Sequence, residues 1–170
     1  MQILEEIPTI KGHWKLDIYD GDRDIDPITG LWVDTKPIEV IEGDNLVVTN
    51  GKTLLLDRLF ALGTPPTQVN SMGVGTDSTA AAVAQTQLNP SVSGTVLVQA
   101  FDSLPTRSGL VVTAITTYAT GTANFSWNEL GLFNGTTNGT SIMFNRIAPI
   151  GPFTKTSAVS IAVTVTVTQS

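Results

Sequence analysis

The residues with the most chemical potential lie in a C-terminal region that is almost empty of charge. Glu129 sits inside the apolar stretch 127–133, and Arg146 sits inside the apolar stretch 142–146. A buried carboxylate needs a cationic partner or hydrogen bonds, because burying an unpaired charge is costly. Glu129 could therefore be a catalytic acid with a raised pKa, working with Asp102 as in a glycosidase. Alternatively, it pairs with Arg146 or accepts hydrogen bonds from loop amides.

The sequence favours the structural interpretation of Glu129. No second acid lies near it in the C-terminal region, and the single histidine, His13, falls on the polar face of a strand. The Gly-x-Ser-x-Gly motif of many hydrolases is also missing. We therefore predict no enzyme and no catalytic residue, and we expect structural roles for Glu129, Arg146, Gly131 and Phe133.

Two further motifs resemble ligand sites only in part. Residues 51–53 read Gly-Lys-Thr before a helix, but the phosphate-binding loop needs a glycine where Leu46 stands. The first loop carries alternating aspartates, yet a calcium loop needs glycine and glutamate where Ile25 and Leu31 stand. A solvated acidic loop is favoured, so no cofactor or metal is predicted. The weak cation candidates are Asp20, Asp22, Asp24 and Asp26.

Composition limits the partners of this 170-residue chain, which has a net charge of −6 and no cysteine. Disulfides and thiolate metal sites are excluded, and a broad phosphate-binding surface is disfavoured, so no nucleic acid is expected. There is no apolar run of about 18 residues, so no membrane insertion is expected. The acidic N-terminus does not look like a secretory signal, which predicts synthesis in a cytoplasm.

The distribution of charge is more informative than its total. Residues 1–60 hold 12 of the 15 acids and 6 of the 9 basic residues. Threonine, serine, asparagine and glycine replace charge in the remaining 110 residues. Interfaces between proteins are depleted in Lys, Glu and Asp. A neutral, threonine-rich surface therefore favours packing against copies of the same chain or against another assembly.

The N-terminal part of the chain predicts an acidic hairpin or arm over residues 1–44. Residues 13–19 alternate, with Trp14, Leu16 and Ile18 on one face of a half-buried strand. A loop rich in Asp, Pro and Gly follows over 20–30, and 31–41 reads as a returning edge strand broken near Pro37.

A single helix is expected at about 51–62, bracing the sheet. Asn50 would cap its start, Gly63 fits a left-handed stop, and two prolines follow. Apolar residues spaced four apart predict a face that packs on the rest of the protein. They are Leu55 with Leu59, and Leu56 with Phe60.

From residue 94 onward the pattern is that of strands, expected at 94–101, 109–119, 122–133, 140–148 and 158–168. In the last strand five branched residues alternate with small polar ones, which fixes its register. Short, regularly spaced strands with one early helix predict a mainly β fold. We expect an antiparallel β-sandwich or small barrel as one core domain, residues 45–170.

Several motifs in a fixed order resemble the small β-rich structural proteins of tailed bacteriophages and prophages. They are Asn50-Gly51 with the leucine-rich helix, Met72-Gly-Val-Gly-Thr76, Thr86-Gln-Leu88, Glu129-Leu-Gly-Leu-Phe133, Phe144-Asn-Arg146 and Lys155. The set is similar to the virion-attachment domains of tail fibre and collar-type proteins, over about 46–168. The resemblance implies a virion component such as a fibre base, a tail accessory protein or a head decoration.

The resulting hypothesis is a non-enzymatic virion protein, made in the host cytoplasm, that forms a trimer or higher ring and docks to neighbouring virion proteins. An alternative is a carbohydrate-binding or host-adhesion module whose partner is a surface glycan. Its sugar-stacking residues would be Trp14, Trp32 and Tyr118. Exposed aromatic rings would favour this alternative, and buried ones would favour the virion role.

Overall fold

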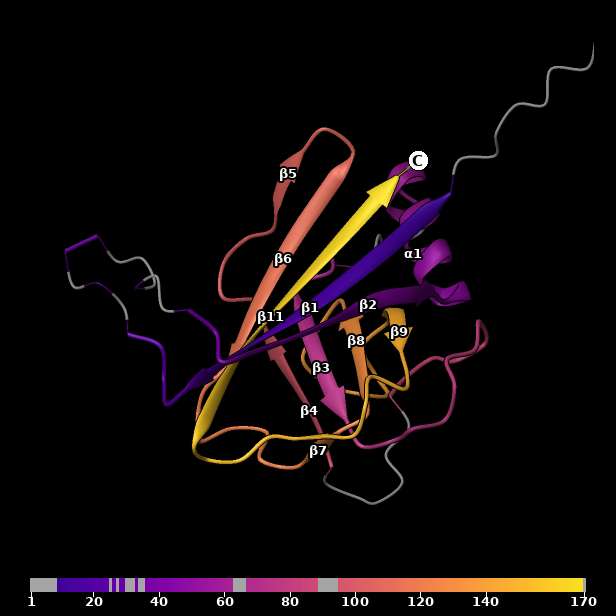
Figure 1. Ribbon diagram of the computed structural model, residues 1–170. Coiled ribbons are helices and arrows are strands. Elements are labelled where there is room, and N and C mark those ends of the chain that lie inside the picture. Colours follow the sequence, from indigo (N-terminus) through magenta and orange to yellow (C-terminus); the bar gives the residue numbers. More distant parts are fainter. Residues whose placement is uncertain are drawn as a thin grey trace, which may run out of the picture.

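The structure is a computed structural model that describes residues 9–24, 26, 28–29, 33, 36–62, 67–88 and 95–169. Within these ranges the fold is mainly β with one helix (Figure 1). The elements are β1 (Ile10–Asp20), β2 (Glu39–Val47), α1 (Thr49–Phe60), β3 (Ser71–Gly75), β4 (Val96–Ala100), β5 (Thr106–Ser108), β6 (Val111–Tyr118), β7 (Ser126–Trp127), β8 (Glu129–Phe133), β9 (Met143–Ile147), β10 (Phe153–Thr154) and β11 (Val159–Gln169).

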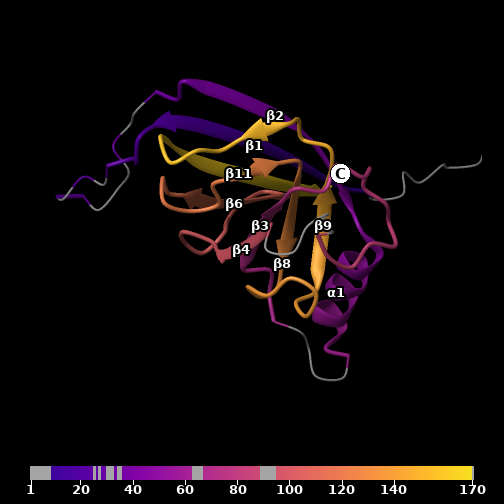
Figure 2. The same cartoon turned by 90° about the horizontal axis from the view of Figure 1, so that it is seen from below.

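Nine of these strands form one antiparallel sheet in the order β4-β3-β8-β9-β2-β1-β11-β6-β5. The sheet curls into a half-barrel, so its two halves face each other across the core (Figure 2). β2 and β9 are joined through only two residue pairs, Leu46 with Arg146 and Val47 with Asn145. The predicted class, a β-sandwich or small barrel with one short helix, is confirmed.

The main core fills the space between the two halves of the curled sheet. Trp14, Leu16 and Ile18 of β1 lie on its inner face, as their alternation predicts. The branched residues of β11 join them, because β1 and β11 pair along all eleven residues of each strand. Met72, Leu130 and their neighbours supply the opposite wall. A smaller cluster lies behind that wall, formed by Val48, Leu88, Phe133 and Met143.

The N-terminal strands are part of the sheet rather than a separate arm. β1 and β2 form the expected antiparallel hairpin, but β1 lies between β2 and β11 near the middle of the sheet. The apolar face of β1 explains the difference, because it can be covered only by the core. β2 begins at Glu39, later than the expected strand, and residues 1–8 of the expected arm lie outside the described part.

Helix α1 differs from the predicted helix in its ends and in its buried side. It starts at Thr49, so Asn50 lies inside it and caps nothing, and Ala61 takes the left-handed position at its end (φ 49°). Gly63 lies outside the described residues. The helix packs on the sheet through Gly51 and Leu54, while the four apolar residues expected to be covered are exposed. No described helix is long and apolar enough to cross a membrane.

Candidate functional site

The motifs that stand far apart in the sequence converge on one face of β3, β8 and β9. Gly73 of β3 pairs with Gly131 of β8, and Gly75 pairs with Glu129. A Cβ atom at Gly75 would collide with the Glu129 carboxylate, and one at Gly131 would crowd the Phe133 ring and Leu88. These glycines therefore leave the space in which a carboxylate and an aromatic ring can lie between strands.

Glu129 is fully buried, and both of its carboxylate oxygens have partners. Oε2 accepts a hydrogen bond from Arg146 Nε at 2.9 Å, and Oε1 accepts one from the backbone N–H of Asp77 at 3.3 Å. The sequence offered an arginine or a loop amide as the partner of this carboxylate, and the structure supplies both. Compensation on both oxygens explains how a carboxylate persists inside the protein.

Arg146 is also fully buried and is held from several sides. Besides Glu129, its Nη1 donates to the backbone oxygen of Thr79 at 2.8 Å and to Oε1 of Gln85 at 2.9 Å. Asp77 Oδ2 lies 3.6 Å from Nη2. The guanidinium thus ties β9 to the loop that follows β3. We call Glu129, Arg146, Asp77, Thr79 and Gln85 the buried charge network.

A change of phase between β7 and β8 places Glu129 on the outer side of this wall. Trp127 and Leu130 both face the main core, so the alternation slips by one residue at Asn128. Glu129 is nevertheless buried, because the loop that carries Asp77 and Leu88 covers this side of the sheet. Periodicity alone would have placed Glu129 beside Phe125 and Trp127, whereas the covering loop is a tertiary feature.

The buried charge network has the arrangement of a structural clamp. A proton-transferring carboxylate must reach a substrate, but Glu129 has no exposed surface. Asp102, the second acid considered for a glycosidase, is exposed at the sheet edge. It accepts hydrogen bonds from the N–H and the hydroxyl of Thr117 at 2.9 and 2.7 Å. The two acids therefore belong to different contact networks.

Lys155 forms a second buried charge that the sequence did not identify as buried. Its Nζ donates to the backbone oxygen of Ala119 at 2.7 Å and to Oδ1 of Asn124 at 2.9 Å. Burial lowers the pKa of this ammonium group, while the charge of Asp22 acts in the opposite direction. The burial of Lys155 could not be predicted from the sequence, because backbone carbonyl groups occur at every residue and do not mark its binding site. The sequence analysis singled out Lys155 only as the last member of the ordered motif set.

Two aspartates of the first loop, Asp22 and Asp26, accept hydrogen bonds from different parts of the chain. Asp22 accepts hydrogen bonds from the N–H and hydroxyl of Thr120 at 2.6 and 2.8 Å, and these bonds lower its pKa. Asp26 accepts from the N–H groups of Ile28 and Thr29. Among the described residues, no cluster of three or more His, Cys, Asp or Glu side chains could hold a metal ion.

The aromatic residues considered for sugar stacking are covered where the structure describes them. Trp14 is 4% exposed and Tyr118 is fully buried. The Tyr118 hydroxyl donates to the backbone oxygen of Met72, and its ring packs edge-on against Trp127. Neither ring offers a face to a sugar in this structure. Trp32 lies outside the described residues.

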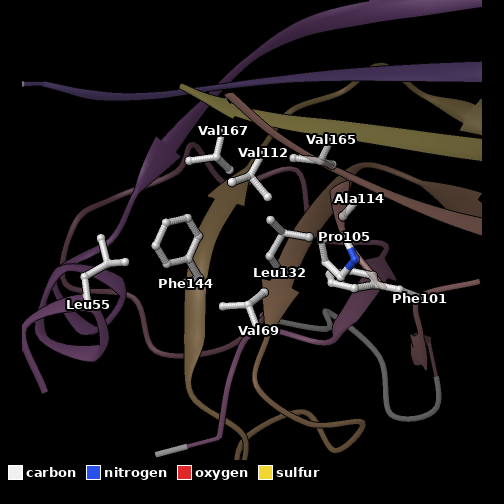
Figure 3. Close-up of a pocket in the computed structure, with 10 residues that line it drawn as sticks. All are labelled: Leu55, Val69, Phe101, Pro105, Val112, Ala114, Leu132, Phe144, Val165 and Val167. Carbon is white, nitrogen blue, oxygen red and sulfur yellow. The ribbon is translucent and has the colours of Figure 1, made fainter. Parts of the chain in front are cut away.

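An apolar groove is the feature that sequence reasoning missed. It lies at the open end of the half-barrel, where β6 and β11 face β8 and β9, and its volume is about 170 Å³ (Figure 3). Val112 and Val167 form one wall, Leu132 and Phe144 form the other, and Leu55 of α1 stands at its edge. All ten residues that line it are apolar. Such a groove binds hydrocarbon surface and has no group for acid–base chemistry.

Comparison of the chain with protein families, with curated proteins and with solved structures found no match in any of the three.

Proposed function

We propose that this chain is a non-enzymatic structural protein of a tailed-phage or prophage virion, acting by self-association and by docking to neighbouring virion proteins. One observation carries the proposal. Three of the six charged residues after residue 60 lie inside the protein: Glu129 and Arg146 are fully buried and paired, and Lys155 is 1% exposed among carbonyl oxygens. What this region leaves on the surface is largely uncharged.

An uncharged β surface suits packing against other subunits. The outward residues of β6 and β11 include Thr113, Thr117, Thr164 and Thr166, all partly exposed. The ordered motif set supports the virion role by resemblance, and three of its motifs, Met72–Thr76, Glu129–Phe133 and Phe144–Arg146, lie in the wall built from β3, β8 and β9. Many weak copies in a closed ring gain strength from multivalency, and closed symmetry stops growth at a fixed number.

Two measurements test the proposal. Sedimentation or light scattering over a range of concentrations should show a discrete oligomer, which we expect to be a trimer or a higher ring. Mass spectrometry of purified particles from cells that express the chain with the rest of its phage genes should detect it as a particle component. A protein that stays monomeric at high concentration and is missing from particles would refute the proposal.

A further inference from the structure

Helix α1 exposes an unusually apolar ridge. Its exposed residues include Leu55 (39%), Leu56 (53%), Leu59 (75%) and Phe60 (64%), followed by Leu62 (57%). At 100° per residue, the four helical side chains cover about 140° of the helix circumference. Together the five residues expose roughly 600 Å², the upper end of the largest apolar patch on a typical monomer. We call these five residues the α1 ridge.

The α1 ridge is continuous with the apolar groove. Leu55 belongs to both, because it stands at the edge of the groove as well as on the helix (Figure 3). The molecule therefore presents a convex apolar ridge beside a concave apolar groove. The groove volume of about 170 Å³ suits one aromatic side chain, since a cavity of roughly 150 Å³ can hold benzene.

We propose that the α1 ridge of one copy occupies the apolar groove of a second copy, with Phe60 as the inserted side chain. This inference rests on the proposed self-association and names the surface that makes it. The expectation from the sequence was a contact through a neutral, threonine-rich surface. The ridge and the groove are a better fit because they bury apolar surface that the monomer leaves exposed.

Charge and area both favour a second copy as the occupant. Each chain carries a net charge of −6, but no charged residue lines the groove, and Asp57 of α1 is balanced by the neighbouring Arg58. Two copies can therefore approach there with little repulsion. The ridge, with the groove walls added, approaches the ~800 Å² per partner of a standard stable interface.

The position of the two surfaces also predicts how the copies are arranged. The ridge and the groove lie side by side, since Leu55 belongs to both. Two copies can therefore exchange ridges in a closed two-fold dimer, or each ridge can enter the groove of the next copy, which closes into a ring or grows as a filament. A closed arrangement satisfies every ridge and every groove.

Matched substitutions on β6 test the groove directly. Val112 lines the groove and is 38% exposed, whereas Ile115, 39% exposed, lies on the same strand and points to the opposite face. Val112→Lys should weaken association at least about tenfold, as expected for a central contact. Ile115→Lys should leave it within about twofold, the behaviour of a position outside the contact.

A second matched pair tests the ridge. Phe60→Glu should weaken association at least about tenfold. Ile38→Glu should not, although Ile38 is equally exposed at 65%. Ile38 precedes β2, whereas α1 follows it, so the two sites are separated by the nine residues of that strand, about 30 Å. Circular dichroism and thermal unfolding should show that all four variants fold.

Cross-linking gives an independent measurement, because the chain contains no cysteine. Protein with only Leu59→Cys is mixed with protein with only Val112→Cys, and a short bis-maleimide is added. A cross-link between the two variants is expected, since the ridge of one copy would lie at the groove of the other. Mixing Ile38→Cys with Ile115→Cys provides the control, which should stay largely unlinked.

The outcomes separate this inference from the proposed function. Association that survives Val112→Lys and Phe60→Glu but is lost in Ile115→Lys would overturn the ridge-and-groove contact and leave self-association intact. Association unaffected by all four variants would do the same. A wild-type chain that is monomeric at every concentration would overturn the ridge-and-groove contact, and its absence from purified particles as well would overturn the proposed function.

Discussion

Two regions of the molecule differ in which side chains they bury. They are the wall built from β3, β8 and β9, and helix α1. The wall buries a glutamate and an arginine completely, whereas α1 leaves a row of leucines and a phenylalanine exposed. Ordinary soluble domains bury apolar residues and expose charged ones. The charged groups of the wall need no second chain, because Glu129 and Arg146 both have partners within the same chain. The α1 ridge has no comparable cover from the described residues, and we propose that a second copy covers it.

The largest expected effect is the loss of the Glu129 carboxylate. Glu129→Ala leaves the Arg146 guanidinium buried without its anion, which should lower the free energy of unfolding by about 3–5 kcal/mol. Chemical denaturation monitored by tryptophan fluorescence measures this. Replacing both members, as in Glu129→Leu with Arg146→Met, should cost less than Glu129→Ala alone. Unchanged stability of Glu129→Ala would contradict the role of the network.

Gly51→Ala probes the contact between α1 and the wall. Alanine favours helix more than glycine does, so propensity alone predicts a gain of roughly 0.5–1 kcal/mol. The added Cβ would, however, collide with the backbone carbonyl of Phe144. We expect a net loss of about 1–3 kcal/mol in thermal or chemical unfolding. Lys52→Ala, at the exposed neighbouring position, is the control and should be nearly neutral.

Lys155→Met probes the second buried charge. The change leaves the backbone oxygen of Ala119 and Oδ1 of Asn124 without their ammonium donor. The expected loss at neutral pH is about 1–3 kcal/mol, typical of buried acceptors left unsatisfied. Lys11→Met, at an exposed position, serves as the comparison in the same denaturation series. Equal stability of the two variants would contradict the role assigned to Lys155.

The same lysine predicts a pH dependence at alkaline pH. Burial lowers the pKa of Lys155 in the folded chain below its ordinary value of 10.5. At a pH between the lowered pKa of the folded chain and the ordinary pKa of the unfolded chain, Lys155 is protonated only in the unfolded chain. The free energy of unfolding therefore rises with pH in this range. The free energy of unfolding of the wild type relative to that of Lys155→Met should rise from pH 7 to pH 11, since the comparison cancels the opposite contribution of Tyr118, whose pKa is raised by burial.

Asp22 predicts a smaller effect on the acid side. Hydrogen bonds from Thr120 lower the pKa of Asp22 below 3.8 in the folded chain. Its stabilising contribution is therefore complete above the unfolded value and is lost as the pH falls through the folded value. Asp22→Asn should unfold more easily than the wild type at pH 6, and this difference should shrink as the pH falls below 3.8. Asp20→Asn is the loop control.

The smallest expected effect belongs to the α1 ridge. Leu59 is 75% exposed, so Leu59→Glu should change the stability of the isolated chain by less than about 0.5 kcal/mol. Thermal unfolding at a concentration low enough to keep the chain monomeric measures this. A large loss would mean that Leu59 packs within its own chain, and the contrast between the ridge and the wall would disappear.

Local patterns predicted the strands whose two faces differ. The alternation in 158–168 gave both the extent of β11 and its inward face, because a slip of one residue would turn every branched side chain outward. The partners considered for Glu129 followed from the cost of burying a charge, which holds in any fold. Both predictions depend on physics that acts within a few residues or on a single group.

Other features needed the assembled fold. The spacing of Leu55 and Leu59 shows that α1 has an apolar side but not whether anything covers it, and the structure buries Leu54 instead. The place of β1 beside β11 depends on pairing Ile10 with Gln169, which no local pattern contains. Asn128 shifts the alternation before β8, and the loop that covers Glu129 comes from a distant part of the chain.

The sequence by itself determined a mainly β chain with one helix, a charged first third, and a glutamate that must be compensated. These follow from periodicity, composition and the energetics of single groups. Tertiary structure alone decided which apolar surfaces are covered, because coverage depends on where distant segments meet. It enclosed Glu129 and Arg146 between a wall and a loop, and it left the α1 ridge and the groove open beside each other.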